Sequence, residues 1–145
     1  MTETAPDTTG LDDLPMDALL HAARSIVARA YAPYSGFPVG AAVLTSDGTI
    51  VTGVNVENAS YGLTVCGERN AVFTAVGQGH GTIRAVAICT PQSPGATPCG
   101  ACRQVLNEFK PADGVLTVIL DGPDGPIVTD LARLLPDAFG PRDLD

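Results

Sequence analysis

Hydrophobic residues recur along the chain with two different periods, and these periods predict its helices and strands. Over residues 15–30 the apolar side chains return at helical spacing, which predicts an amphipathic helix with one buried face. Residues 39–44 and 49–54 are short apolar runs on either side of Ser46-Asp47-Gly48. Because this tripeptide is typical of a tight turn, the two runs predict an antiparallel hairpin.

The second half of the chain alternates between strand-like and helix-like segments. Residues 83–90 form a largely apolar run, uninterrupted over 85–89, as in a buried central strand. The other predicted elements are a helix from Cys66 to about Val76, a helix over 99–109, and strands at 115–120 and 127–129 with a turn at 121–125 between them. A last helix is predicted over 131–135, with Asp130 as its N-cap. This order predicts an α/β fold, with one mixed sheet and helices packed on it.

Composition bounds the number of domains. The chain has 145 residues, of which 45% are hydrophobic and 17% charged, values typical of one folded globular domain. Residues 1–13 are polar and acidic without any periodicity, so we expect a disordered extension there. The domain itself is then expected to span residues 14–145.

Charge and hydropathy limit the kinds of partner that this protein can bind. The net charge is -8 and the basic residues form no cluster, which argues against a nucleic-acid partner and favours a small neutral substrate. The N-terminus lacks the pattern of a signal peptide, and no apolar run approaches the roughly 20 residues that span a bilayer. We therefore expect a cytoplasmic protein without a membrane partner, whose cysteines are thiols or metal ligands.

Two short cysteine clusters carry the candidate chemistry. They are Cys66-Gly67-Glu68-Arg69 and Pro98-Cys99-Gly100-Ala101-Cys102-Arg103. Zinc is commonly held by such thiolates, and three protein ligands leave a fourth position for water. A zinc-bound water is a strong nucleophile at neutral pH, and Glu68 is the candidate that would accept its proton and return it to a substrate.

We expect both clusters to lie at helix N-termini, and the spacing of the first cluster requires it. Cys66 and Glu68 are two residues apart, which in mid-helix would separate them by about 200°. Both can reach one metal only where a helix begins. There the helix dipoles would also lower the pKa values of the thiols. Arg69 is expected to donate a hydrogen bond to the metal-binding thiolates, whereas Arg103 is expected to be a surface residue or a packing contact.

A structural zinc site without catalysis is the alternative, with Cys89 as a fourth ligand. Four-cysteine sites normally come as two close pairs, and Cys66 has no second cysteine nearby. Cys89 lies inside an apolar run, where a buried unreactive thiol is the usual interpretation.

Together these motifs resemble the short, homotetrameric, zinc-dependent cytidine deaminases of the cytidine/deoxycytidylate deaminase superfamily. The matching segments are residues 33–41, 55–62, 66–69, 98–104 and 134–139, and the likeness covers about residues 15–140. It implies a three-layer fold whose five-stranded mixed sheet carries helices on both faces. It also implies hydrolytic deamination of cytidine and 2′-deoxycytidine to uridine and 2′-deoxyuridine plus ammonia in pyrimidine salvage, by a homotetramer with one zinc ion per chain.

The resemblance also implies roles for individual residues. Those that match the family's site are Cys66, Cys99 and Cys102 as zinc ligands, Glu68 as proton shuttle, Asn55 and Glu57 at the ribose hydroxyls, Phe37 on the pyrimidine, Tyr61 lining the pocket, and Phe139 reaching a neighbouring subunit's site. Without the cysteines nearby, the polar pair would read as a solvated loop and the aromatic residues as core. Gly67 stands where the family commonly has Ala near the substrate ring, and we expect it to alter affinity without abolishing activity.

Three other functions stay open. A deaminase of another aminopyrimidine nucleoside, such as blasticidin S, would share the zinc motifs, but the segment 55–61 favours cytidine. A nucleic-acid-editing deaminase is disfavoured by the acidic composition and by Cys66, because those relatives have His as first ligand. A non-catalytic zinc-stabilised binding module would show no turnover at all.

Overall fold

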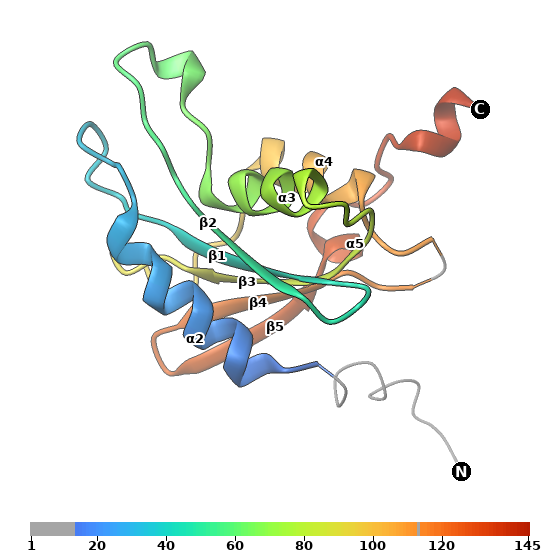
Figure 1. The fold of residues 1–145 in the computed structure, drawn as a ribbon, viewed down its shortest axis with the longest axis horizontal. Helices are drawn as coiled ribbons and strands as arrows, with labels where there is room; N and C mark the ends of the chain where they lie inside the picture. The colour runs from blue at the N-terminus through green and yellow to red at the C-terminus, as the bar shows by residue number, and fades with distance from the viewer. Residues whose placement is uncertain (1–13, 113) are drawn as a thin grey trace.

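The structure is a computed structural model that describes residues 14–112 and 114–145 (Figure 1). The extension predicted at residues 1–13 lies outside this part. One sheet runs through the molecule in the order β2-β1-β3-β4-β5. Its strands are β1 (Gly40–Thr45), β2 (Ile50–Val54), β3 (Ile83–Cys89), β4 (Thr117–Gly122) and β5 (Gly125–Asp130). Strands β3 and β4 pair in parallel and the other neighbours pair antiparallel, so the sheet is mixed, as predicted.

Helices cover both faces of this sheet. Helix α2 (Met16–Ile26) lies on one face, and α3 (Gly67–Gly77), α4 (Gly100–Glu108) and α5 (Leu131–Leu134) lie on the other (Figure 1). Short 3-10 turns follow α2 and precede α3, namely η1 (Val27–Arg29) and η2 (Tyr61–Leu63), and a third, η3 (Pro141–Leu144), lies near the C-terminus. The three-layer α/β fold is confirmed.

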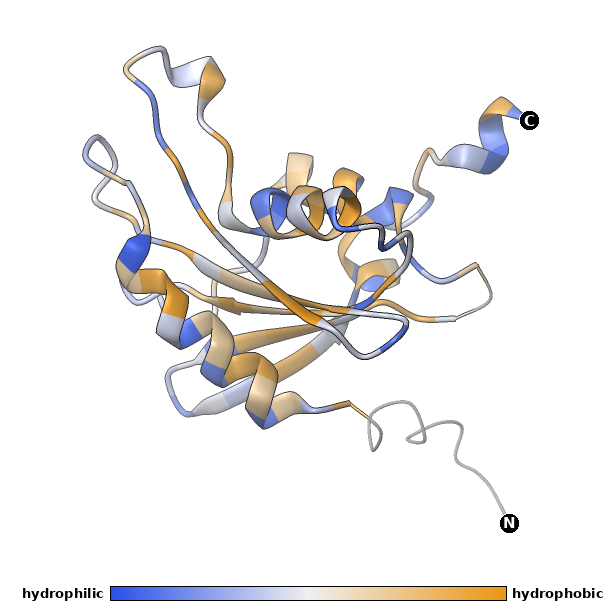
Figure 2. Cartoon of the chain, viewed as in Figure 1, coloured by the Kyte–Doolittle hydropathy of each residue, from blue (hydrophilic) through white to orange (hydrophobic). Residues whose placement is uncertain are grey.

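Two hydrophobic cores, one on each face, explain why the central strands are mostly apolar. In β1, Ala41 and Val43 belong to the core under α3, whereas Ala42 and Leu44 belong to the core under α2. Every residue of β1 is buried. A strand covered on both faces needs apolar side chains at every position, because successive residues point to opposite faces. In Figure 2 the hydrophobic colour accordingly runs along the central strands of the sheet.

The β4–β5 hairpin is longer than predicted. The residues expected to form a turn, 121–125, largely belong to the strands, since Asp121 pairs with Pro126 and Gly122 with Gly125. Gly125 adopts a φ of 125°, which favours glycine and allows the reversal. Asp121 is accommodated in a strand because its carboxylate accepts two hydrogen bonds from Arg24 of α2, at 2.7 and 2.9 Å.

Gly53 in β2 allows α3 to approach the sheet closely. A Cβ atom at this position would lie 2.3 Å from the backbone nitrogen of Ala71 and 2.7 Å from the carbonyl oxygen of Gly67. Both atoms belong to helix backbone, which cannot move without displacing α3. Because Gly53 has no side chain, α3 and its N-cap residue Cys66 can lie this close to the sheet.

Replacing Gly53 by Ala should lower the free energy of unfolding by about 1–3 kcal/mol or more, the usual cost of overpacking. Urea unfolding would measure this. Gly81→Ala is the matched control, because nothing lies within 4 Å of a Cβ atom there. Equal unfolding midpoints for the two variants would contradict the close approach.

Candidate metal and active site

Helices α3 and α4 begin at the same place. Cys66 and Cys99 are the N-cap residues of the two helices, and Cys102 lies in the first turn of α4. The three Sγ atoms all lie within 4.8 Å of one another, and those of Cys66 and Cys99 are 3.7 Å apart. Among the described residues, this is the cluster that could hold a metal ion.

The arrangement fits zinc. Tetrahedral ligands at about 2.3 Å from the ion place neighbouring sulfurs about 3.8 Å apart. Cys102 is fully buried whereas Cys99 is exposed, so the cluster is closed on one side and accessible on the other. Cys89 is not part of it, and burial raises the pKa of its thiol to about 11. The described residues thus supply three thiols to one centre and leave a fourth position open.

Hydrogen bonds favour the thiolate form of Cys66. The Cys102 thiol donates to it, which lowers the pKa of Cys66 to about 5 and raises that of Cys102. Arg69 Nη2 also donates to Cys66 Sγ, over 3.4 Å. The N-terminus of α3 adds partial positive charge at the same atom. Arg69 therefore lies where a hydrogen-bond donor to the thiolates was expected.

Glu68 is buried at the second position of α3. Its exposed fraction is 5%, and Oε1 has no hydrogen-bond partner among the described residues. Burial raises the pKa of this carboxyl to about 7, so it can both take up and release a proton near neutral pH. A buried polar atom without a partner is uncommon and calls for an explanation. A substrate group or water at the open side of the cysteine cluster would supply one.

The polar residues after β2 hold the loop that precedes β1. Asn55 Oδ1 accepts a hydrogen bond from the Val39 N–H at 2.9 Å, and its Nδ2 donates to the Phe37 carbonyl at 2.8 Å. Glu57 accepts from the N–H groups of Tyr34 and Ser35, at 2.9 and 3.0 Å, and from the Ser35 hydroxyl. The structure therefore brings Phe37, Asn55 and Glu57 together.

Glu57 is held as a charged acceptor. The hydrogen bonds from the Ser35 hydroxyl and backbone lower the pKa of its carboxyl. Three hydrogen bonds occupy most of the about four lone-pair positions of a carboxylate, and leave room for a substrate hydroxyl. The sequence did not single out Ser35, whose contribution depends on a partner 22 positions away.

Gly67 connects the metal cluster to this loop. A Cβ atom at Gly67 would lie 3.1 Å from the Val39 carbonyl oxygen and 3.3 Å from the Asn55 backbone nitrogen. The absent methyl group was expected to matter near the substrate ring. In the structure a methyl group at Gly67 would lie tightly against the backbone of Val39 and Asn55. Its absence therefore allows Asn55 to keep its place beside α3.

The predicted aromatic residues differ in exposure. Phe37 packs partly buried against the core under α3. Tyr61 is 74% exposed, with its ring centroid 5.9 Å from that of Tyr34, and Phe139 is 59% exposed. Tyr61 and Phe139 thus lie on the surface of the single chain and not in its core.

Arg103 was expected to be a surface residue or a packing contact, and the structure places it half-buried with three hydrogen bonds. Its Nε donates to the Pro98 carbonyl at 2.7 Å, Nη1 to the Leu134 carbonyl at 2.7 Å, and Nη2 to Thr97 Oγ1 at 3.0 Å. The sequence did hold one signal for this. Arg103 is four residues after Cys99, and in a helix this spacing puts both on one face.

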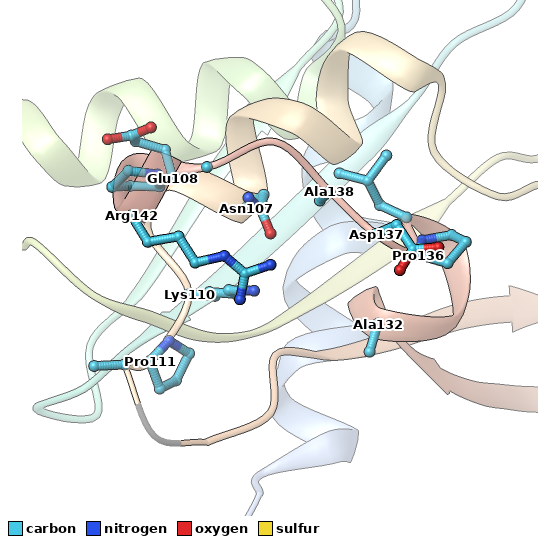
Figure 3. Close-up of a pocket in the computed structure, with 13 residues that line it drawn as sticks. Asn107, Glu108, Lys110, Pro111, Ala132, Pro136, Asp137, Ala138 and Arg142 are labelled. Carbon is cyan, nitrogen blue, oxygen red and sulfur yellow. The ribbon is translucent and has the colours of Figure 1, made fainter. Parts of the chain in front are cut away.

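A separate cavity of about 560 Å³ lies between the end of α4, α5 and the C-terminal segment (Figure 3). The side chains of Lys110 and Arg142 point into it. The acidic residues Glu108 and Asp137 also line it, and none of the cysteines does. Its charges balance and the candidate chemistry lies elsewhere, so this cavity is distinct from the reaction site.

Comparison with known proteins defines the class. The family model described as the cytidine and deoxycytidylate deaminase zinc-binding region matches residues 15–118, and the chain belongs to this family. Zinc is accordingly its cofactor, in agreement with the three-cysteine cluster.

Individual relatives are similar over nearly the whole chain. The cytidine deaminase of Sporosarcina psychrophila is 43% identical over 132 residues, which cover 90% of this chain and 96% of that protein. The crystal structure of cytidine deaminase from Burkholderia pseudomallei shares 44% identity with a TM-score of 0.79, covering 87% of this chain and all of that one. For the enzyme from Mycobacterium leprae the identity is 42% and the TM-score 0.75, over 86% of this chain and all of that one. No helix within the described residues is long and apolar enough to cross a membrane.

Proposed function

We propose that this chain is a zinc-dependent cytidine deaminase that hydrolyses cytidine and 2′-deoxycytidine to uridine and 2′-deoxyuridine and releases ammonia. The observation that carries the proposal is the buried Glu68, with one unpartnered oxygen, beside three thiols at zinc-binding distances. Relatives with more than two fifths of their residues identical are named cytidine deaminases.

The residues of α3 and α4 divide the chemistry between them. Cys66, Cys99 and Cys102 hold zinc, which when bound supplies a Lewis acid that lowers the pKa of water to about 7. Glu68 Oε1 accepts one proton of the attacking water and delivers it to N3 of the ring. It then takes the second proton from the hydroxyl group added at C4 and passes it to the departing amine, so that C4 becomes a carbonyl and ammonia leaves. Arg69 offsets part of the negative charge of the thiolates, because it donates to Cys66.

The loop residues bind the nucleoside. Asn55 and Glu57 hold the ribose hydroxyls, and Phe37 packs on the pyrimidine. Tyr61 lines the pocket, and Phe139 completes the pocket of a neighbouring chain in a homotetramer. The exposure of these last two aromatic rings supports an assembly that covers them. A cytoplasmic location, where pyrimidine nucleosides are salvaged, belongs to the same proposal.

The test is the loss of absorbance at the cytidine band on mixing zinc-loaded protein with cytidine. Turnover is expected, with release of ammonia. A zinc-loaded chain that leaves cytidine unchanged would overturn the proposal. Turnover of blasticidin S alone would then indicate the related nucleoside deaminase, turnover of an oligonucleotide alone an editing enzyme, and no turnover a zinc-stabilised binding module.

Replacing Glu57 by Gln should lower kcat/KM for cytidine by about 10- to 100-fold, mainly through KM. A hydrogen bond to a charged group contributes about 1.5–3 kcal/mol, and the amide also sets an N–H group among the donors of Tyr34 and Ser35. Steady-state kinetics with metal analysis would measure this, and zinc content should not change. Asp124→Asn in the exposed β4–β5 turn is the control. Unaltered cytidine kinetics would remove Glu57 from the ribose site.

A further inference from the structure

Among the described residues, the hydrogen bonds that join the loop before α4 to elements beyond Thr90 all come from one side chain, that of Arg103. Within residues 91–98, the other described hydrogen bonds join the loop to itself or to Thr90. Arg103 Nε and Nη2 bind the Pro98 carbonyl and the Thr97 hydroxyl, the two residues that directly precede Cys99. Pro98 has no N–H group, so its carbonyl is the backbone group through which this end of the loop can be held.

The third bond of Arg103 fixes the loop to another element. Nη1 donates to the carbonyl of Leu134, the last residue of α5. Carbonyl groups at the end of a helix have no partner within the helix, so this one is available to the guanidinium. One planar fork with five donors thereby joins the approach to Cys99 to the end of α5.

The segment that Arg103 uses as its anchor is itself attached to α4. Gln104 Nε2 and Asn107 Nδ2 both donate to the carbonyl of Phe139, at 2.8 and 3.2 Å. Asn107 is 4% exposed, so its amide is held in place by its surroundings. Two hydrogen bonds therefore bind the carbonyl of Phe139 to α4, five residues after the Leu134 carbonyl that Arg103 uses.

Cys99 is the cysteine that needs such support. Cys102 is buried within a helix and Cys66 receives a hydrogen bond from Arg69, but Cys99 is exposed at the end of the loop. Its Sγ atom nevertheless lies 3.7 Å from that of Cys66, and two thiolates at this distance repel each other without a metal. We propose that Arg103 is a positioning residue of the metal site, which holds Cys99 at ligand distance by joining Thr97 and Pro98 to α5.

The proposal rests on the proposed zinc site but not on cytidine turnover. Its test compares the rate of zinc release to a chromophoric chelator in Arg103→Gln, Arg103→Lys and Thr97→Val. Arg103→Gln should release zinc about 10- to 100-fold faster, as for other partners that orient metal ligands. Arg103→Lys should also release zinc faster, because an ammonium group cannot reproduce the three-point fork. Arg133→Gln, an exposed arginine of α5, is the control and should match the parent.

Cobalt-substituted protein supplies a readout that a general loss of stability would not change. The ligand-field and sulfur-to-cobalt bands should shift in both Arg103 variants and keep their parent form in Arg133→Gln. Thr97→Val removes one hydrogen bond at an exposed residue, and should give a smaller effect in the same direction even where Arg103→Gln does not fold. Parent-like zinc release and cobalt spectra in Arg103→Lys and Thr97→Val would overturn the proposal. A parent chain that takes up no zinc would overturn the proposed function instead.

Discussion

Replacing Glu68 by Gln is expected to lower kcat for cytidine by about 10²–10⁴-fold, the range typical of a lost general acid–base group. The amide has nearly the same shape but cannot carry a proton between water, ring and amine. Because Glu68 does not belong to the cysteine cluster, zinc content should stay at the parent level. Single-turnover absorbance measurements and metal analysis on the same sample would establish both.

The same substitution should not destabilise the fold. Glu68 is 5% exposed with an unpartnered oxygen, and a buried carboxyl group in this state is unfavourable for stability. A neutral amide in its place should leave the melting temperature unchanged or raise it. Loss of activity together with unchanged or increased stability is the pattern expected of a residue retained for catalysis.

Glu108→Gln, in an exposed position on α4, is the control for charge and should behave as the parent does. Two results would contradict the assigned role of Glu68. A kcat close to that of the parent would show that another group carries the proton. Loss of zinc in Glu68→Gln would show that the carboxylate supports the metal site itself.

Features that depend on local spacing could be predicted from the sequence. Cys66 begins a helix, as its separation from Glu68 required, and Cys99 begins the helix predicted from residue 99. The hairpin of β1 and β2 formed at the Ser-Asp-Gly turn, and β3 took the central place that its uninterrupted apolar run indicated. In each case the evidence lies within a few residues of the feature.

Features that depend on distant partners could not be predicted. Asp121 was assigned to a turn because its partner Arg24 is 97 positions away in the sequence. Arg103 was expected to be a surface residue or a packing contact, because its bond to Leu134 spans 31 positions and leaves no local signal of that partner. The sequence around a polar side chain does not indicate which distant group will become its hydrogen-bond partner in the folded chain. Its surroundings in the folded chain decide whether it is solvated or structural.

Substitution within the cysteine cluster is expected to have the second large effect on activity. Cys102→Ser should lose zinc and cytidine turnover together, by more than the about 100-fold that outer partners of metal ligands contribute. A serine hydroxyl stays protonated near neutral pH and is a poor zinc ligand, whereas Cys102 Sγ lies within 4.8 Å of both other thiols. Metal analysis after dialysis, with activity assayed before and after added zinc, would measure the loss.

Cys89→Ser is the matched control, because Cys89 is also a buried cysteine but lies outside the cluster. It should keep one zinc ion per chain and parent turnover. If Cys102→Ser retained zinc through dialysis, Cys102 would not be a ligand. If Cys89→Ser lost it, the metal would have four cysteine ligands and no position for a reacting water. Since the three-thiol arrangement is what leaves that position open, the contrast between these two serine variants tests whether the site is catalytic or structural.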